Sequence, residues 1–319
     1  MNITTSVIIT AHNYARFLPR CLKSVLGQTL PADQIIVVDD GSTDQTREVV
    51  SSFPSVRYIW QANAGKAAAF NRGFNASEGD LICHLDADDY WLPEKLRRVT
   101  EVLSRCEAGG ITHDAFIVDQ DDKYLYESER ATEHNPATRH FSFREVLLMC
   151  FLYRPGNSVT GNLGTINTIC AWKEAVADIF DLPAGLGLAV DGAMLLGVAR
   201  RGLLYLPEKL SVYRHHGHNS FVGNAASHQT QRRLFEWVPN IPGATSSEVK
   251  SLSEALVVEM EVQSALRNNE KPFSTAYKAA VLNIKLLNLG LVPNWKHLAT
   301  PVACLVQWQR IRTALFHVS

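Results

Sequence analysis

Short apolar runs alternate with segments of helical periodicity through the first hundred residues of this chain. The runs lie at 5–10, 35–40, 56–60 and 80–86, and helices are predicted between and after them, including one at 65–77 and one opened by Pro93. Strands that are apolar throughout are typical of parallel sheets with helices on both faces. The alternation therefore predicts an α/β fold, with a Rossmann-like, mostly parallel sheet flanked by helices.

Three carboxylates come directly after the run at 80–86: Asp86, Asp88 and Asp89. In an open α/β sheet the carboxyl ends of the strands form the edge where ligands bind, and crowded like charges repel unless they share a cation. Mg²⁺ or Mn²⁺ takes one or two carboxylates and fills its other positions with water and phosphate oxygens. The cluster predicts a divalent metal site. The alternative is an acidic turn in which Asp89 caps the next helix.

Composition limits the function classes. The 319 residues have room for one large α/β domain and an appended region, and a net charge of −1 gives no reason to expect a nucleic-acid partner. Six cysteines lie far apart, several inside apolar runs, which is typical of reduced core thiols. No run of about twenty apolar residues and no basic, apolar leader is seen. We expect a cytoplasmic protein that does not span a membrane.

The strict alternation ends after Gly109 and Gly110. Strands are predicted at 111–119, 123–128 and 164–172, a loop at 130–140, a helix at 188–202, and two short strands at 203–206 and 209–214. Residues 217–230 are rich in Gly, Asn, Ser and Ala and have little to bury, so they predict a mobile loop. A helical C-terminal region follows, at 231–319.

Four sequence segments in the first half of the chain resemble a known family: SVIITAHNYARFLPRCLKSVLGQT, IIVVDDGSTDQT, NAGKAAAFNRGFNASEGD and LDADDYWLPEKL. In this order and spacing they resemble the catalytic domain of family 2 glycosyltransferases. The resemblance implies the GT-A fold and inverting transfer from a nucleotide-diphosphate sugar. It divides the chain into a catalytic domain at 1–230, with a nucleotide-binding half at 1–106 and an acceptor-side half with the mobile loop at 107–230, and the helical region at 231–319.

The resemblance also implies a donor site. Its residues would be Thr10, Ala11, His12, Asn13, Asp39, Asn63, Gly65, Lys66, Asp86, Ala87 and Arg214. Asp39 would bind the nucleobase of the donor. Since a carboxylate can accept the imide N–H of uracil, a UDP-sugar is the expected donor. Asp40 beside it either joins the site or braces the turn. The implied ligands of Mn²⁺ or Mg²⁺ are Asp88, Asp86 and His216.

The chemistry needs a base for the acceptor hydroxyl. Relatives usually carry a Glu-Asp pair at the start of a helix, and here the pair is Val190-Asp191. The resemblance implies that Asp191 is the base, while the alternative is that it only caps the helix. A second departure is Phe70, where many relatives have Arg; Lys66 is the residue that would compensate.

The resemblance thus implies a metal-dependent transferase that moves a single sugar to a glycan or lipid-linked acceptor in cell-surface polysaccharide synthesis. The Gln-x-x-Arg-Trp signature of processive synthases is absent, and AHNYARFL lacks the glycine-rich loop of a nucleotidyltransferase. The alternative is a catalytically inactive relative that binds nucleotide sugar or glycan. The C-terminal helices predict either a packed subdomain or a peripheral contact with the inner face of the membrane.

Overall fold

The structure is a computed structural model that describes residues 3–127, 139–143, 145–147, 168–216, 232–243, 249–250, 253–254 and 257. The chain divides into two compact units, 1–227 and 228–319. The loop predicted at 217–230 and most of the predicted C-terminal helices lie outside the described residues. Within the described part, no helix has the length and apolar character needed to cross a bilayer.

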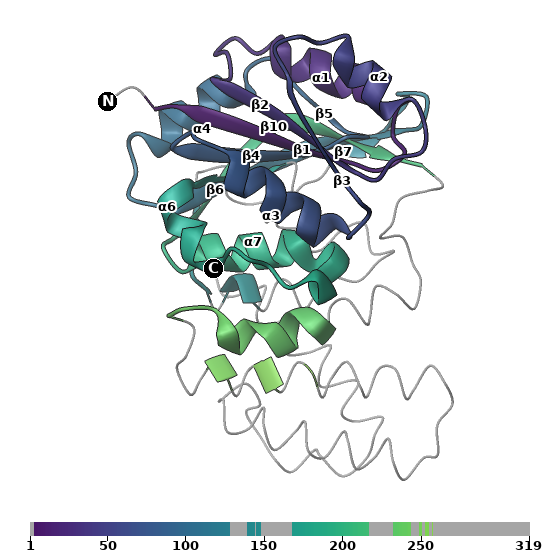
Figure 1. Ribbon diagram of the computed structural model, residues 1–319. Helices are drawn as coiled ribbons and strands as arrows, with labels where there is room; N and C mark the ends of the chain where they lie inside the picture. The colour runs from purple at the N-terminus through teal and green to yellow at the C-terminus, as the bar shows by residue number, and fades with distance from the viewer. Residues whose placement is uncertain are drawn as a thin grey trace. The chain divides into compact units, whose positions relative to one another are not determined.

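A ten-stranded mixed sheet forms the centre of the first unit (Figure 1). Its main path, in spatial order, runs through β3 (Arg57–Gln61), β2 (Gln34–Asp40), β1 (Thr5–Ala11), β4 (Leu81–Asp86), β9 (Cys170–Trp172), β6 (Gly110–Asp119), β10 (Leu203–His215) and β5 (Tyr90–Trp91). Beside this path, β7 (Tyr124–Glu127) pairs with β6, and β8 (Arg139–Phe141) with β10. The longest pairings, β1 with β2 and β4 and β6 with β10, are parallel, while β9 is antiparallel to both neighbours. The predicted mostly parallel α/β sheet is confirmed.

Helices cover both faces of this sheet (Figure 1). They are α1 (Leu18–Leu26), α2 (Thr46–Ser51), α3 (Lys66–Ala76), α4 (Lys95–Leu103), α6 (Lys173–Val176) and α7 (Val190–Ala199), with short 3₁₀ turns η2 (Ala177–Ile179) and η3 (Ala184–Ala189). Leu22 and Val25 of α1 pack in one apolar cluster with Val7 and Ile9 of β1. On the opposite face, Ala69 of α3 packs with residues of β2. Because strand side chains alternate between faces, both sides of each central strand must be apolar.

Three predictions for the second half of the first unit are wrong in detail. The two short strands predicted at 203–206 and 209–214 form one strand, β10, because bulges between Leu206 and Ser211 keep it paired with β6. The end of the loop predicted at 130–140 is strand β8. The helix predicted from 188 begins at Val190, since Gly187 has a non-helical backbone with φ of 52°.

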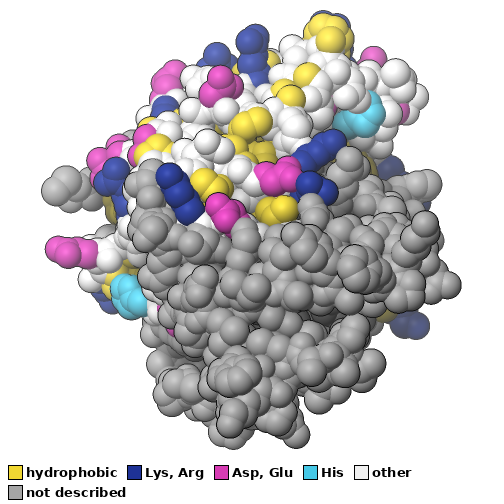
Figure 2. Space-filling model, turned by 90° about the horizontal axis from the view of Figure 1, so that it is seen from below, with side chains coloured by type: hydrophobic (Ala, Val, Ile, Leu, Met, Phe, Trp, Pro, Cys, Tyr) yellow, Lys and Arg dark blue, Asp and Glu magenta, His cyan; other side chains and the backbone are white. Residues whose placement is uncertain are grey.

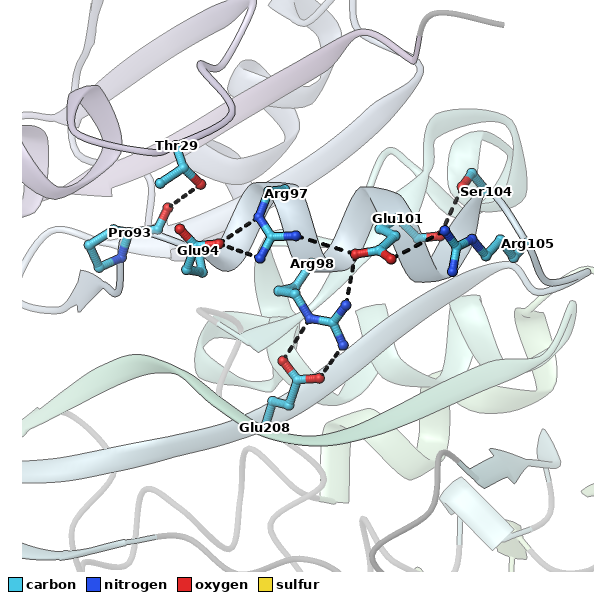
Figure 3. A network of polar contacts seen from close by, with 9 residues as sticks. All are labelled: Thr29, Pro93, Glu94, Arg97, Arg98, Glu101, Ser104, Arg105 and Glu208. Atoms are coloured by element: carbon cyan, nitrogen blue, oxygen red, sulfur yellow. Dashed lines mark hydrogen bonds and ion pairs between the residues drawn. The ribbon is translucent and has the colours of Figure 1, made fainter.

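Strand β10 is tied to α4 by an ion-pair network (Figure 3). Arg98 of α4 donates to both carboxylate oxygens of Glu208, with Nε 3.0 Å from Oε2, and to Glu101 within the helix at 2.7 Å. The backbone of Leu92, just before α4, also bonds to Leu210 at 3.0 Å. These contacts fix the middle of β10 relative to the chain that follows β4.

Charges of both signs are mixed on the surface, in keeping with the net charge of −1. Figure 2 shows Lys and Arg side chains interspersed with Asp and Glu side chains on the described part of one face. The described part of this face therefore carries no large patch of a single charge sign.

In the second unit, the described residues form a helical turn at 232–237 that continues into η4 (Val238–Asn240). Leu234, Phe235 and Val238 are buried there. The hydroxyl of Ser253 donates to the carbonyl of Phe235 at 2.5 Å.

Candidate active site

The carboxyl ends of β1, β2 and β4 meet at one edge of the sheet. Register places Thr10 opposite Asp86 and Ala11 opposite Asp39. The side chains of Ala11 and Ala87 belong to the apolar core, so they contribute to the edge only through their backbone. The structure thus brings together residues that lie far apart in the sequence.

Asp39 is buried and held by two donors. One carboxylate oxygen accepts the backbone N–H of Ser42 at 2.8 Å, and the other accepts the hydroxyl of Tyr58 at 2.6 Å. Burial, together with this hydrogen bond, raises the pKa of Tyr58. Each carboxylate oxygen has a second lone pair, so Asp39 can still accept an N–H from a ligand.

Asp40 organises the loop that leads into α3. Its carboxylate accepts the backbone N–H groups of Ala64 and Gly65 at 2.9 and 2.8 Å and the amide of Gln61 at 2.7 Å. Gly65 has φ of 88°, a conformation that favours glycine. The structure therefore supports the bracing role that the sequence left open for Asp40.

His12 joins this loop to the end of β1. Its Nδ1 lies 2.8 Å from the carbonyl of Asp40 and so donates to it, which leaves Nε2 as an acceptor for the amides of Asn13 and Asn63, each 3.3 Å away. Asn13 has φ of 60° and accepts the backbone N–H of Thr43 at 2.8 Å. His12 therefore contacts both Asn13 and Asn63, and all three were predicted to belong to the sugar-donor site.

Asp86, Asp88 and Asp89 can each offer one ligand atom, and these atoms lie within 4.8 Å of one another. Asp88 also contacts Nε2 of His216 at 3.0 Å. Carboxylate oxygens suit either Mn²⁺ or Mg²⁺, whereas an added imidazole nitrogen suits the transition metal Mn²⁺ better than Mg²⁺. Asp89 accepts the backbone N–H of Arg214 at 2.7 Å, which ties this turn to β10. The alternative in which Asp89 caps α4 does not hold, because Glu94 is the N-cap residue.

Lys66 lies between two of the acids. Its ammonium is 3.0 Å from Asp86 and 3.2 Å from Asp191. Burial alone would lower the pKa of Lys66, but Asp191 and Asp86 outweigh it and raise that pKa. Burial would likewise raise the pKa of Asp86, but Lys66 lowers it. Lys66 and Asp86 are therefore both charged at neutral pH.

Asp191 lies in the first turn of α7, and Ala189 is the N-cap residue. No side-chain cap hydrogen bond is formed at this helix start. The alternative in which Asp191 only caps the helix is therefore not supported, and the structure places its carboxylate at the edge of the sheet beside Lys66.

Arg214 is engaged by protein groups. Its guanidinium donates to the carbonyl of Asp88 at 2.9 Å, pairs with Asp122 at 2.7 Å and lies 4.9 Å from the ring centre of Phe17. The side chain is 3% exposed. It therefore holds the backbone of the acidic turn, beside the donor site in which the resemblance places Arg214.

The sequence reasoning missed the aromatic residues of this edge. The ring of His216 stacks on Phe17 with centroids 5.1 Å apart and meets Tyr14 edge-on at 5.9 Å. Burial, followed by the charges of Asp88 and Asp86, raises the pKa of Tyr14. The only signal in the sequence was their place in the loop and helix after the first strand.

Phe70, at the position where many relatives carry Arg, is buried against His84 with ring centroids 4.6 Å apart. Burial lowers the pKa of His84 to about 3, so the imidazole is neutral. Phe70 thus serves the packing of α3 on the sheet, and the ammonium that contacts Asp86 belongs to Lys66.

Comparisons with known proteins agree with this geometry. Residues 6–161 match the model of the family described as "Glycosyl transferase family 2". The uncharacterized glycosyltransferase alr2836 of Nostoc sp. is 34% identical over 236 residues, which cover 71% of this chain and 69% of that protein. Chondroitin synthase of Pasteurella multocida is 38% identical over 93 residues, or 28% of this chain and 10% of that protein.

A solved structure shares the fold. The S. aureus TarS fragment 1–349 in complex with UDP-GlcNAc superposes with a TM-score of 0.64 at 14% sequence identity, covering 98% of this chain and 91% of that one. At this identity the likeness supports the fold, here the GT-A fold, and residue roles must come from the site itself.

Proposed function

The chain belongs to glycosyl transferase family 2, and on this premise we propose that it moves a single sugar from a UDP-sugar, with inversion, to a glycan or lipid-linked acceptor. The observation that carries the proposal is the ion-pair chain from Asp86 through Lys66 to Asp191. It brings a carboxylate beside a group of potential metal ligands, which is the arrangement that glycosyl transfer requires.

The donor would bind along the carboxyl edge of the sheet. Asp39, with a free lone pair on each oxygen, would accept the imide N–H of uracil, and His12, Asn13 and Asn63 would shape the pocket around the nucleoside. The TarS complex supports the uridine nucleotide, since that relative in fold was solved with UDP-GlcNAc. Thr10, which lies opposite Asp86, would face the ribose.

Asp86, Asp88 and His216 would hold Mn²⁺ or Mg²⁺. A bound divalent ion supplies Lewis-acid neutralisation of the departing diphosphate. Arg214 keeps the backbone of Asp88 in place through its bond to the carbonyl, and Asp89 anchors the same turn to β10. The ligand groups are thus positioned before any donor arrives.

Asp191 would remove the proton of the acceptor hydroxyl. Attack from the face opposite the diphosphate then inverts the anomeric carbon, and the proton is held on the carboxylate oxygen. Lys66 orients this carboxylate in the donor-free protein through their 3.2 Å contact. When the donor binds, the ammonium is also close enough to Asp86 to contribute positive charge beside the diphosphate.

The inactive-relative alternative rests on Val190, which replaces the first acid of the usual pair and is buried. Its side chain packs in the core, so an acid at this position would itself need a buried partner. The second acid keeps its place at the edge of the sheet. We therefore favour catalysis.

The location follows from the same proposal. Cys21, Cys83, Cys106 and Cys170 are free thiols, which supports a reducing compartment. We propose that the protein works in the cytoplasm, with peripheral contact at the inner face of the membrane if its acceptor is lipid-linked.

Calorimetry tests the donor class directly. UDP, GDP, TDP and CDP would each be titrated with Mn²⁺, with Mg²⁺ and with chelator. We expect metal-dependent binding of UDP that is lost in Asp88→Ala. A folded sample that binds none of the four would favour the inactive alternative. Asp191→Asn should abolish transfer while donor binding stays intact, and unchanged transfer would show that another group is the base.

A further inference from the structure

The segment that leads into α7 has an unusual backbone. Asp181 has φ of 90° and Gly187 has φ of 52°. A non-glycine residue in this region is strained, and such strain persists only where the surroundings fix the conformation. What fixes this segment therefore also bears on the position of Asp191, in the first turn of α7.

Helix α3 holds this segment through Asn71. The side-chain amide donates to the carbonyl of Leu182 at 2.9 Å, and its oxygen accepts the N–H of the same residue at 2.9 Å. A primary amide can donate and accept side by side, so it replaces the backbone partner that Leu182 would have in a sheet. The amide also lies 3.5 Å from the carboxylate of strained Asp181.

Aromatic packing supports the same contact. Phe180 stacks on Phe74 of α3, with ring centroids 3.5 Å apart, and lies 5.3 Å from Phe70. Leu182 is buried. One end of the segment is thus anchored near the middle of α3.

The other end reaches the start of the same helix. Lys66, the first residue of α3, pairs with Asp191 at 3.2 Å. Lys66 and Asn71 are about one and a half turns apart on a rigid helix. Helix α3 therefore sets the distance between Asp191 and Asp86. Lys66 contacts both carboxylates, and Asn71 holds Leu182 in the segment that leads to Asp191.

We propose that Asn71 is a positioning residue for the reaction, acting through Leu182 on the placement of the Asp191 carboxylate. This rests on the proposed function, in which Asp191 is the base. Without the amide, the segment would lose both bonds to α3 and Asp191 would sample positions away from Lys66. A displacement of about 1 Å at a reacting group costs on the order of 100-fold in rate.

The test compares Asn71→Ala and Asn71→Asp with the control Asn75→Ala, which changes an exposed residue on the same helix. Release of nucleoside diphosphate from UDP-N-acetylglucosamine, UDP-glucose, UDP-galactose and GDP-mannose is measured with Mn²⁺ and with water as the acceptor. We expect kcat to fall about 10- to 100-fold in both Asn71 variants, with KM for the donor within twofold of wild type. Asn75→Ala should behave as wild type.

A second readout needs no substrate. Hydrogen exchange of the amides at 182–191 should be faster in Asn71→Ala than in Asn75→Ala, while exchange in β1 and β4 stays unchanged. A general loss of protection, or a rise of KM in proportion to the fall of kcat, would mean that Asn71 serves only the fold and would overturn the proposal. Asn71→Asp keeps the acceptor oxygen for Leu182, so it provides a folded variant if Asn71→Ala is unstable.

The double variant Asn71→Ala/Asp191→Asn separates this proposal from the proposed function. If Asn71 acts through Asp191, its loss should not lower the residual rate of Asp191→Asn further. A further fall would overturn the positioning role. Loss of activity in Asp191→Asn with an unchanged kcat in Asn71→Ala would overturn the positioning role alone. Full activity in Asp191→Asn would overturn the base assignment and the positioning role with it.

Discussion

Nε2 of His216 lies 3.0 Å from Oδ2 of Asp88, so the end of strand β10 meets the acidic turn that follows β4. The two groups are 128 residues apart in the sequence, and each is nine-tenths or more buried. An imidazole in contact with a carboxylate either joins it in binding a metal or orients it for that role.

From this contact we expect His216→Ala to lower the affinity for Mn²⁺ in the presence of UDP about 10- to 100-fold. Asp88→Ala should abolish it. The exposed Asp121, which pairs with Arg16 at the surface, provides the control Asp121→Ala. Titration of Mn²⁺ into a fixed concentration of protein and UDP measures the effect. Wild-type affinity in His216→Ala would show that the imidazole has no part in the metal site.

Lys66→Met should destabilise the protein at neutral pH. Asp86 and Asp191 would then lose the ammonium that they share. We expect this loss to lower the free energy of unfolding by on the order of 3 kcal/mol. Lys66 lowers the pKa of Asp86 below its ordinary value, so this stabilisation is present above about pH 4 and is lost as the pH falls through the folded-state pKa.

Thermal unfolding of wild type and Lys66→Met between pH 3 and pH 8, in chelator, checks this prediction. The difference in Tm should be largest near neutrality and shrink below about pH 4. Added Mn²⁺ should recover part of it, since a divalent ion can replace the missing charge. Lys23→Met, on an exposed position of α1, is the control. A difference that does not vary with pH would argue against the ion pair as its source.

His84 should make stability depend on pH in a range where carboxylates contribute little. Burial lowers its folded-state pKa to about 3, while an unfolded histidine titrates near 6.5. The unfolded chain therefore binds the proton first, and stability is lost as the pH falls below about 6.5. Between pH 7 and pH 5 this amounts to about 2 kcal/mol.

Urea unfolding at the two pH values tests the role of His84. Wild type should lose this stability between pH 7 and pH 5, and His84→Gln should not. The exposed His140 gives the matched variant His140→Gln, which should follow wild type. Parallel pH dependence in wild type and His84→Gln would contradict a buried, neutral imidazole.

Arg98→Ala should lower stability by about 1 kcal/mol. Its guanidinium makes two bonds to Glu208, but both side chains are about a third exposed, which limits the gain. Arg97 pairs with Glu94 and Glu101, which lie within one turn of it along the chain. Arg97→Ala should therefore lower the free energy of unfolding by less than Arg98→Ala. A double-mutant cycle of Arg98 with Glu208 measures the coupling directly. A coupling near zero would mean that the ion pair adds nothing to the apolar packing and backbone contacts that hold β10 against α4.

The sequence predicted the elements whose signal is local. Runs such as 35–40 are apolar on both faces because helices cover both sides of β2, and the period of the residues at 66–76 marks α3. The acids at the end of β4 could be predicted as a cluster, because strand ends in a parallel sheet meet at one edge.

Features that depend on distant contacts could not be predicted. Nothing near Lys66 indicates that it would meet Asp191, because the partners lie on different helices. Arg214 has the residue type of a phosphate ligand, and only the fold shows its guanidinium bound to Asp88 and Asp122. The amide of Asn71 belongs to a familiar motif, yet its partner Leu182 lies in a segment with no periodic signal.

The place of β9 in the sheet has a consequence for how the chain acquires its structure. This strand of three residues, Cys170–Trp172, lies between β4 and β6 and pairs antiparallel with both. During synthesis, β4 cannot pair with β9 until nearly ninety more residues have left the ribosome. In the described sheet, β6 is connected to the first four strands through β9. The sheet that contains the first four strands is thus completed by a strand from a much later part of the chain, so we expect the first unit to fold as one cooperative unit.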